Sequence, residues 1–393
     1  MRAARLTVAR VITVLAVLAG VAAATGSPTA LAVEQSVTLA VLPPISQPGA
    51  TPARPSAART VMTVNVTPTV PGRTVRLDRM TSGSWQRVAT TTVTSRGLAE
   101  FSAATYVNGL PATYRATALA YQGQPAITSA SAMSTRWGAA DFVEQFSGTA
   151  LSGAWSHRGP DYNPAGLRGC SKGSPQAVKV ASGTVRLSVI RDDSRSDLCT
   201  AYRANGTVIG QFNYRLNGHI STAGRYDLTY GVAAARMKFQ QSRGQHAAFW
   251  MQPSSPVPGA TSAAQGGAEI DVIEWFGDTG TNGGLAGSVY YPTGNGTAKA
   301  GGLIPDPNSY LSGLSDSWWS SFHVFSVEWS PAGYVFRVDG RETWRTSEGV
   351  SARPEYLILS LLSSDYELPN LGGEERLPQH AYVDWVQFWR SAD

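Results

Sequence analysis

The sequence predicts an all-β protein that consists of two antiparallel β-sandwiches in tandem. Charged residues make up only 15% of the chain, which fits an all-β extracellular protein better than a helical cytosolic one. Short runs rich in Val, Tyr, Phe and Trp, residues that are favoured in strands, recur along most of the chain. A length of 393 residues suits about two or three domains.

The N-terminus has the features of an export signal. Arg2, Arg5 and Arg10 precede an apolar stretch at residues 11–24, and small residues at 30–32 supply a cleavage site. The apolar stretch is shorter than the roughly 20 residues that a membrane span needs, and an uncleaved anchor is the alternative. We therefore expect a signal peptide at residues 1–32, a secreted protein, and no membrane association after cleavage.

The charge and the cysteines narrow the class of protein further. The formal net charge is +5, and removing the three leader arginines leaves 5 − 3 = 2. Because no run of five to eight basic residues is present, we expect no nucleic-acid partner. Cys170 and Cys199 are the two cysteines, and export makes a disulfide between them the expected state. Nothing in the sequence demands an oligomer, so we expect a monomer.

The first part of the exported chain predicts a linker and then a small domain. Residues 33–57 are rich in Pro, Ala, Ser and Thr, which is typical of a linker or an edge segment. Residues 58–134 contain alternating runs separated by turn signals, which predicts a small immunoglobulin-like β-sandwich. This module carries no catalytic pattern. A spacer is favoured over a carbohydrate-binding module, and this interpretation predicts that residues 137–393 alone keep activity.

Residues 137–393 predict a second, larger domain. Its clearest strand runs are residues 225–230, 232–239, 247–251, 268–275, 285–291, 323–329, 334–338, 356–362 and 382–389. So many antiparallel strands with so few helical patterns are expected to form two stacked sheets, in a jelly-roll sandwich.

One acidic run in this domain has the spacing that glycoside hydrolysis requires. On a strand, Glu269 and Asp271 share one face, and one extra residue in a β-bulge would bring Glu274 to the same face. Three neighbouring carboxylates repel one another, so at least one pKa is raised. A pair with separated pKa values can act as nucleophile and acid/base in glycoside cleavage. The alternative is a solvated acidic face.

The second domain resembles glycoside hydrolase family 16, the laminarinase and licheninase family. The run from Glu269 to Glu274 is similar to the bulged form of that family's signature. Further blocks resemble the family in the same order along the chain, and these are residues 142–148 (FVEQFSG), 230–238 (YGVAAARMK), 245–251 (QHAAFWM), 322–330 (FHVFSVEWS), 334–340 (YVFRVDG) and 382–388 (YVDWVQF).

The resemblance implies the fold and a role for each matching residue. The fold would be a concanavalin-like β-jelly roll. Glu269 would be the nucleophile, Glu274 the acid/base, and Asp271 would hydrogen-bond the nucleophile. The implied substrate-binding residues are Trp250, Trp275 and Tyr290. No cofactor is implied for catalysis, but the family often carries a structural calcium ion, for which Glu144 and Asp384 stand in the matching region.

The implied activity is retaining endo-hydrolysis of a β-1,3- or mixed-linkage β-1,3-1,4-glucan. The polysaccharide substrate would then be the expected partner. The chain departs from the family at His246, where a Trp is usual, and at residues 287–291, where a His is frequent, which leaves the polysaccharide open. A transglycosylase, a galactan-type hydrolase and a non-catalytic β-glycan-binding protein are the alternatives. Such binding proteins typically lack the two catalytic glutamates, and both are present here.

Overall fold

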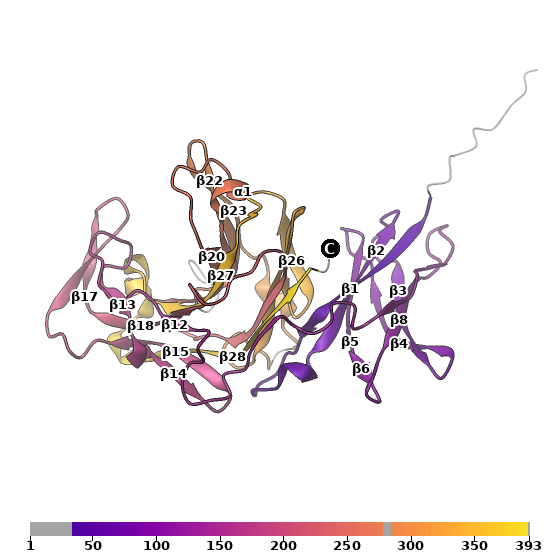
Figure 1. Ribbon diagram of the computed structural model, residues 1–393, viewed down its shortest axis with the longest axis horizontal. Coiled ribbons are helices and arrows are strands. Elements are labelled where there is room, and N and C mark those ends of the chain that lie inside the picture. The colour runs from indigo at the N-terminus through magenta and orange to yellow at the C-terminus, as the bar shows by residue number, and fades with distance from the viewer. Residues whose placement is uncertain (1–33, 278–283, 314, 392–393) are drawn as a thin grey trace, which may run out of the picture. The chain divides into compact units, whose positions relative to one another are not determined.

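The chain folds almost entirely into β-strands. The computed structural model describes residues 34–277, 284–313 and 315–391 (Figure 1). The predicted signal peptide, residues 1–32, lies outside these ranges. Among the described residues, the only α-helix is α1 (Ala263–Gly266), and no helix in them has the length and apolar character to cross a membrane.

The first module has two antiparallel sheets around one core. The strand orders are β1-β2-β5 and β10-β8-β3-β4, with β9 paired to β8. Val64, Leu77 and Tyr114, which come from both sheets, are at most 1% exposed in this core. The module is therefore a small β-sandwich, and its immunoglobulin-like topology stays a prediction. The strand bounds are β1 (Ser36–Ser46), β2 (Arg59–Thr67), β3 (Thr74–Thr81), β4 (Ser84–Thr92), β5 (Leu98–Ala103), β6 (Tyr106–Val107), β7 (Leu110–Pro111), β8 (Thr113–Ala118), β9 (Ile127–Thr128) and β10 (Ala132–Met133).

The predicted linker at residues 33–57 is wrong over most of its first half, because β1 lies there. Val37 and Val41 of β1 are buried in the core of the module, which draws this segment into the sheet. β1 is an edge strand, so its prolines do not interrupt a second ladder. The register with β2 shifts on both sides of Pro44, so the strand accommodates its prolines through local irregularities.

The catalytic domain is built on one continuous sheet of 16 strands. Its main order is β23-β22-β21-β20-β27-β18-β15-β28-β19-β24-β25-β26, and the short strands β11, β12, β13 and β14 pair at its margins. The strand bounds are β11 (Phe142–Glu144), β12 (Ser156–His157), β13 (Ser171–Gly173), β14 (Val178–Ala181), β15 (Thr184–Arg191), β16 (Leu198–Tyr202), β17 (Val208–Asn213), β18 (Arg215–Ser221), β19 (Gly231–Lys238), β20 (His246–Pro253), β21 (Glu269–Trp275), β22 (Leu285–Thr293), β23 (Gly296–Leu303), β24 (His323–Ser330), β25 (Gly333–Val338), β26 (Arg341–Thr346), β27 (Glu355–Leu362) and β28 (Gln379–Arg390).

This sheet folds back on itself into two layers. The strands from β23 to β18 form one layer and those from β15 to β26 form the other, and their facing side chains make one core. Phe249 and Leu359 of the first layer and Val327 and Phe388 of the second are all fully buried in it. Alternating inward apolar residues from two layers produce a sandwich. The predicted concanavalin-like jelly roll is confirmed.

Some strand predictions in this domain were wrong or missing. Residues 225–230 form no strand, and only Leu228 makes an isolated bridge, to Glu355. The sequence prediction missed every strand between β13 and β18, as well as β23 and β26. β14 and β16 are short, and β23 and β26 are poor in strand-forming residues, so these four give little signal. β15 (TVRLSVIR) is as long as β19 and β20 and alternates apolar residues, so its strand could have been predicted.

The small module and the jelly roll share a hydrophobic cluster. Leu42, Ile45 and Val61 of the module pack with Trp385 and Trp389 of β28, and none of the five is more than 3% exposed. Gly340, which has φ +81°, lies so close to Val61 that a Cβ there would stand 2.1 Å from its Cγ2 atom. Part of the jelly-roll surface is therefore buried by the module, while the choice between a spacer and a carbohydrate-binding module stays a prediction.

A buried arginine reinforces the same contact. Arg236 of β19, 1% exposed, donates from Nε to the Gln47 carbonyl oxygen at 2.7 Å and from its terminal nitrogens to the carbonyl oxygens of Thr51 and Gly49 at 3.1 and 3.2 Å. It also pairs with Asp384 of β28. The loop between β1 and β2 of the small module is thus held to the jelly roll by hydrogen bonds from one buried side chain to three backbone carbonyl groups.

The predicted disulfide is confirmed. Cys170 and Cys199 are bonded, with their Cα atoms 5.5 Å apart. The bridge fixes the base of the β16–β17 hairpin, which forms a small sheet of its own. Leu368 of the 3-10 helix η4 (Asp365–Leu371) packs in the same cluster as both cysteines, so hairpin, bridge and η4 make one unit.

Candidate active site

The three carboxylates of the acidic run lie on one strand, and the predicted bulge is present there. Glu269 stands opposite Tyr290 and Asp271 opposite Ser288 on β22, but the next paired residue is Glu274, opposite Ala286. The register with β20 shifts at the same place. One extra residue between Asp271 and Glu274 returns Glu274 to the face of Glu269 and Asp271. We call this face of the first layer the carboxylate face.

Burial and mutual repulsion alter the ionisation of these groups. Asp271 is 4% exposed, and burial, followed by the charges of Glu274 and Glu269, raises its pKa well above the ordinary value. Burial is also the largest cause of a raised pKa at Glu274, while a nearby His246 and Lys299 act in the opposite direction. A carboxyl with a raised pKa keeps its proton to higher pH than an ordinary one, as a general acid requires.

The carboxylate of Glu269 is held by a glutamine that the sequence prediction missed. Gln252 of β20 donates from Nε2 to Glu269 Oε2 at 2.7 Å. Its own carbonyl oxygen accepts from Arg158 Nη2 at 3.1 Å and from the Tyr356 hydroxyl at 2.9 Å. These two donors fix the orientation of the amide, so that its NH₂ group can only face Glu269. No sequence pattern links the four residues, which come from separate segments.

We predict that Gln252→Leu lowers kcat/KM by roughly 10- to 100-fold, because a hydrogen bond to a charged group contributes about 1.5–3 kcal/mol. Leucine keeps most of the volume but cannot donate to Glu269. Gln86→Leu, on the exposed side of β4, is the matched control and should behave as wild type. Steady-state kinetics on the cleaved polysaccharide would measure both, and a Gln252→Leu value within twofold of wild type would contradict the role.

Glu274 opens into a pocket of 450 Å³ beside the carboxylate face. The pocket combines acidic, basic and aromatic side chains. Its lining includes Glu274, Phe276, Tyr290, Lys299, Tyr366, Glu367 and, from the β16–β17 turn, Arg203. A polar cavity beside a buried acid, with aromatic side chains around it, suits a sugar ring, because such rings present both hydroxyls and apolar C–H faces.

The predicted substrate-binding residues divide into two groups. Trp250 lies opposite Asp271 on β20, and its Nε1 donates to Ser360 Oγ at 3.1 Å. Tyr290 lines the pocket of Glu274. Both therefore lie beside the carboxylate face, and their contact with sugar stays a prediction. Trp275 was predicted wrongly: it is fully buried in the core, and its Nε1 donates to the Gln240 carbonyl oxygen at 2.7 Å, because it alternates with Glu274 on the strand.

A further buried acid stands directly behind the start of β21. Glu355 of β27 is fully buried, and its Oε1 accepts from Ser351 Oγ at 2.6 Å and from the Ala268 amide at 3.1 Å. Burial raises the pKa of Glu355 to about 8. This carboxyl is therefore protonated at neutral pH, next to the residue that precedes Glu269.

We predict that the wild-type protein loses stability as the pH rises from 5 to 8, and that the Glu355→Gln variant loses less. Burial raises the pKa of Glu355 in the folded state to about 8, whereas the unfolded value is near 4.5, so the folded chain binds the extra proton in this window. The free energy of unfolding therefore falls as pH rises, by roughly 2–4 kcal/mol in total. Glutamine does not titrate. Urea unfolding at both pH values would measure the change, with Glu375→Gln, at an exposed position, as control. Equal losses in both variants would contradict the prediction.

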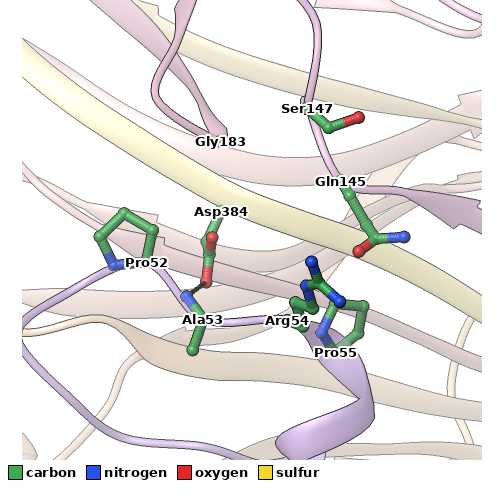
Figure 2. A pocket seen from close by; sticks show the side chains of 8 residues that line it. All are labelled: Pro52, Ala53, Arg54, Pro55, Gln145, Ser147, Gly183 and Asp384. Atoms are coloured by element: carbon green, nitrogen blue, oxygen red, sulfur yellow. Dashed lines mark hydrogen bonds between the residues drawn. The ribbon is translucent and has the colours of Figure 1, made fainter.

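The residues expected to hold calcium do not fit that ion. Asp384 pairs with the Arg236 guanidinium and accepts the Ala53 amide at 2.9 Å, as Figure 2 shows for Ala53. Glu144 accepts from the Phe146 amide at 2.8 Å and from Ser152 Oγ. Both carboxylates are thus already satisfied, and the arginine supplies the positive charge. Within the described part of the chain, no three His, Cys, Asp or Glu side chains gather in a way that could hold a metal.

Comparison with known proteins gives a family. The model of "Glycosyl hydrolases family 16" matches residues 174–385, which is more than half of the chain, and confirms the resemblance in the sequence. Comparison with curated protein sequences found no match.

Solved structures that resemble the chain include three laminarinases or glucanases. The laminarinase catalytic domain from Thermotoga maritima MSB8 is 19% identical over 65% of this chain and 99% of its own, with a TM-score of 0.49. The endo-β-1,3-glucanase from Pyrococcus furiosus is 19% identical over 64% and 94%, with 0.47. A laminarinase from Flavobacterium sp. UMI-01 is 18% identical over 64% and 100%, with 0.44. At these values their activities are not transferred to this chain. The family model, in contrast, covers the carboxylate face and both layers of the jelly roll, and the chain belongs to family 16 of the glycosyl hydrolases.

Proposed function

We propose that this glycoside hydrolase is a secreted, retaining endo-β-glycanase that cleaves β-1,3- or mixed-linkage β-1,3-1,4-glucan. The observation that carries the proposal is the bulged strand β21, which brings Glu269, Asp271 and Glu274 to one face and places Glu274 in a pocket. Two carboxyl groups with different surroundings are the machinery of double displacement.

In the first step an oxygen of Glu269 bonds to the anomeric carbon, and the bond from that carbon to the leaving oxygen breaks. The proton of Glu274 passes to the leaving oxygen. In the second step water attacks the anomeric carbon, the bond to Glu269 breaks, and the proton of the water passes to Glu274. Gln252 holds Glu269 for both steps. Asp271, which burial and its neighbours favour in the protonated form, can donate to the nucleophile.

A galactan-type substrate is the second candidate, and one observation favours it. The pocket of Glu274 carries Arg203 and Lys299, two cations that a neutral glucan does not need. A galactan with sulfate groups would offer them a charged partner. Lys299 also lies near Asp271 and Glu274, so neutralisation of these acids explains one of the two cations without an anionic substrate.

Product analysis on a panel of polysaccharides tests the proposal. The panel is laminarin, barley mixed-linkage glucan, agarose, carrageenan and xyloglucan, with Glu269→Ala as the inactive control. Short oligosaccharides from laminarin or barley glucan, formed first as the β-anomer by NMR, would support it. Products of the α-anomer would contradict the retaining mechanism, and products from carrageenan alone would favour the second candidate. Transfer products without hydrolysis would indicate a transglycosylase.

A further inference from the structure

A histidine and a glutamate form a buried pair next to the acid/base. His246, the first residue of β20, contacts Glu367 of η4 through its Nδ1 atom, 2.7 Å from Glu367 Oε2. Both side chains are 5% exposed. The same oxygen accepts the Ser364 amide at 3.0 Å in the capping box of η4. Because a carboxylate oxygen that accepts two hydrogen bonds does not donate, the Nδ1 atom of His246 carries the proton.

The register of β20 and β21 places this pair beside Glu274. Ala248 lies opposite Glu274 and Ala247 opposite Trp275, so His246 stands diagonally across from Glu274 on the carboxylate face. Diagonal neighbours of this kind lie within reach of long side chains. The His246 ring also stacks on Phe276, which directly follows β21, with centroids 5.1 Å apart. Glu367, Phe276 and Glu274 all line one pocket.

Several other charged or titratable groups face Glu274. They come from every element packed around it, and are Glu269 and Asp271 of β21, Tyr290 of β22, Lys299 of β23, Tyr366 and Glu367 of η4, and Arg203 of the β16–β17 turn. Burial raises the pKa of Glu274, and of the charged neighbours that lower it, His246 has the larger effect, followed by Lys299. His246 therefore opposes the effect of burial and of the neighbouring acids more strongly than Lys299 does.

We propose that His246, oriented by Glu367, is a positioning residue that allows Glu274 to release its proton. The proposal rests on the role of Glu274 as acid/base. In the first step Glu274 must hold a proton that it can donate. In the second step it must be a carboxylate that accepts a proton from water, although burial and the neighbouring acids favour its protonated form. The contact with Glu367 fixes the His246 ring beside Glu274, and positive charge on that ring favours the carboxylate form of Glu274.

His246→Gln removes the titrating ring and keeps an amide that can donate to Glu367. We expect the alkaline limb of the kcat/KM profile to move up by about half to one pH unit. We also expect hydrolysis of the covalent glycosyl-enzyme to slow by roughly 3- to 10-fold, so that this species accumulates in intact-mass spectra of the quenched enzyme. Laminarin and barley glucan are the substrates. His380→Gln is the matched control, since His380 of β28 contacts Ser188 at 2.9 Å, outside the site.

A second measurement needs neither activity nor a His246 variant. The chain has five histidines, so NMR titration of histidine-labelled protein can follow each ring. If His246 and Glu274 interact, the effect is reciprocal, and Glu274→Gln must shift the titration of His246 to lower pH, while His157 and His380 stay unchanged.

The outcomes separate this proposal from the proposed function. A shifted His246 titration in a protein that cleaves no polymer would support the pair and reject the glucanase. Overlapping wild-type and Glu274→Gln titrations of His246, or a His246→Gln profile that coincides with those of wild type and His380→Gln, would overturn the proposal even in an active enzyme.

Discussion

Glu269→Ala and Glu274→Ala should each lower kcat by at least about a thousandfold while leaving the fold intact, because a nucleophile or a positioned proton donor contributes several orders of magnitude. Neither side chain supports the core: both are partly exposed on the carboxylate face, unlike Ile270 and Ile273 between them. Removing them relieves repulsion with the buried Asp271. Circular dichroism and steady-state kinetics on the cleaved glucan would test both parts of the expectation.

Azide can separate the two roles on an activated aryl glycoside. In Glu269→Ala, azide would enter from the face that the nucleophile left and give the α-glycosyl azide. In Glu274→Ala, the glycosyl-enzyme still forms, so azide would give the β-glycosyl azide. Glu375→Ala, at an exposed position, should match wild type. Near-normal activity in either catalytic variant would reject the site, and exchanged azide stereochemistry would reject the assignment of the roles.

Deleting the first module should destabilise the catalytic domain, although its own core would remain. Residues 137–393 alone would expose Trp385, Trp389 and Val232, which now pack against Leu42 and Ile45. Uncovering a large apolar side chain costs about 1.5–3 kcal/mol, so two of them already cost roughly 3–6 kcal/mol out of a typical total of 5–15 kcal/mol.

The expected result is a fragment that aggregates or that melts roughly 10–20 °C below the protein lacking only residues 1–32. A pair of single substitutions makes the same test without deletion. Val61→Asp places a charge in the shared cluster, where Val61 is 1% exposed, whereas Val88→Asp alters an exposed residue of the same module. Calorimetry should show a large drop for Val61→Asp only. A fully active fragment with an unchanged melting temperature would contradict this expectation and support the spacer interpretation.

The parts of the fold that the sequence predicts are those whose signal is local. The strands at residues 247–251 and 382–389 are dense in strand-forming residues, and β20 and β28 contain them. The bulge after Asp271 could be inferred because period-two alternation fails there for a functional reason: without an extra residue, Glu274 would point into the core. Such a conflict between pattern and chemistry can be recognised from the sequence alone.

The rest depends on contacts between distant segments. His246 and Glu367 are 121 residues apart, and Arg158 reaches Gln252 across 94, so no spacing rule relates them. Trp275 looked like a groove residue because it adjoins Glu274, but alternation turns it inward. The segment at residues 36–46 resembled a linker because of its prolines. Its apolar residues indicate a strand only once it is known that β2 offers a free edge with which they can pair.

The position of β28 has a consequence for how the chain is made. This strand, Gln379–Arg390, lies between β15 and β19 in the middle of its layer, and its two tryptophans complete the cluster with the first module. β15 and β19 are therefore both synthesised before the strand that pairs with them, and neither domain can close its surface until β28 has been made. Non-local pairing of this kind is slow and leaves strand edges open. A premature stop shortly before residue 379 should therefore destabilise both domains at once.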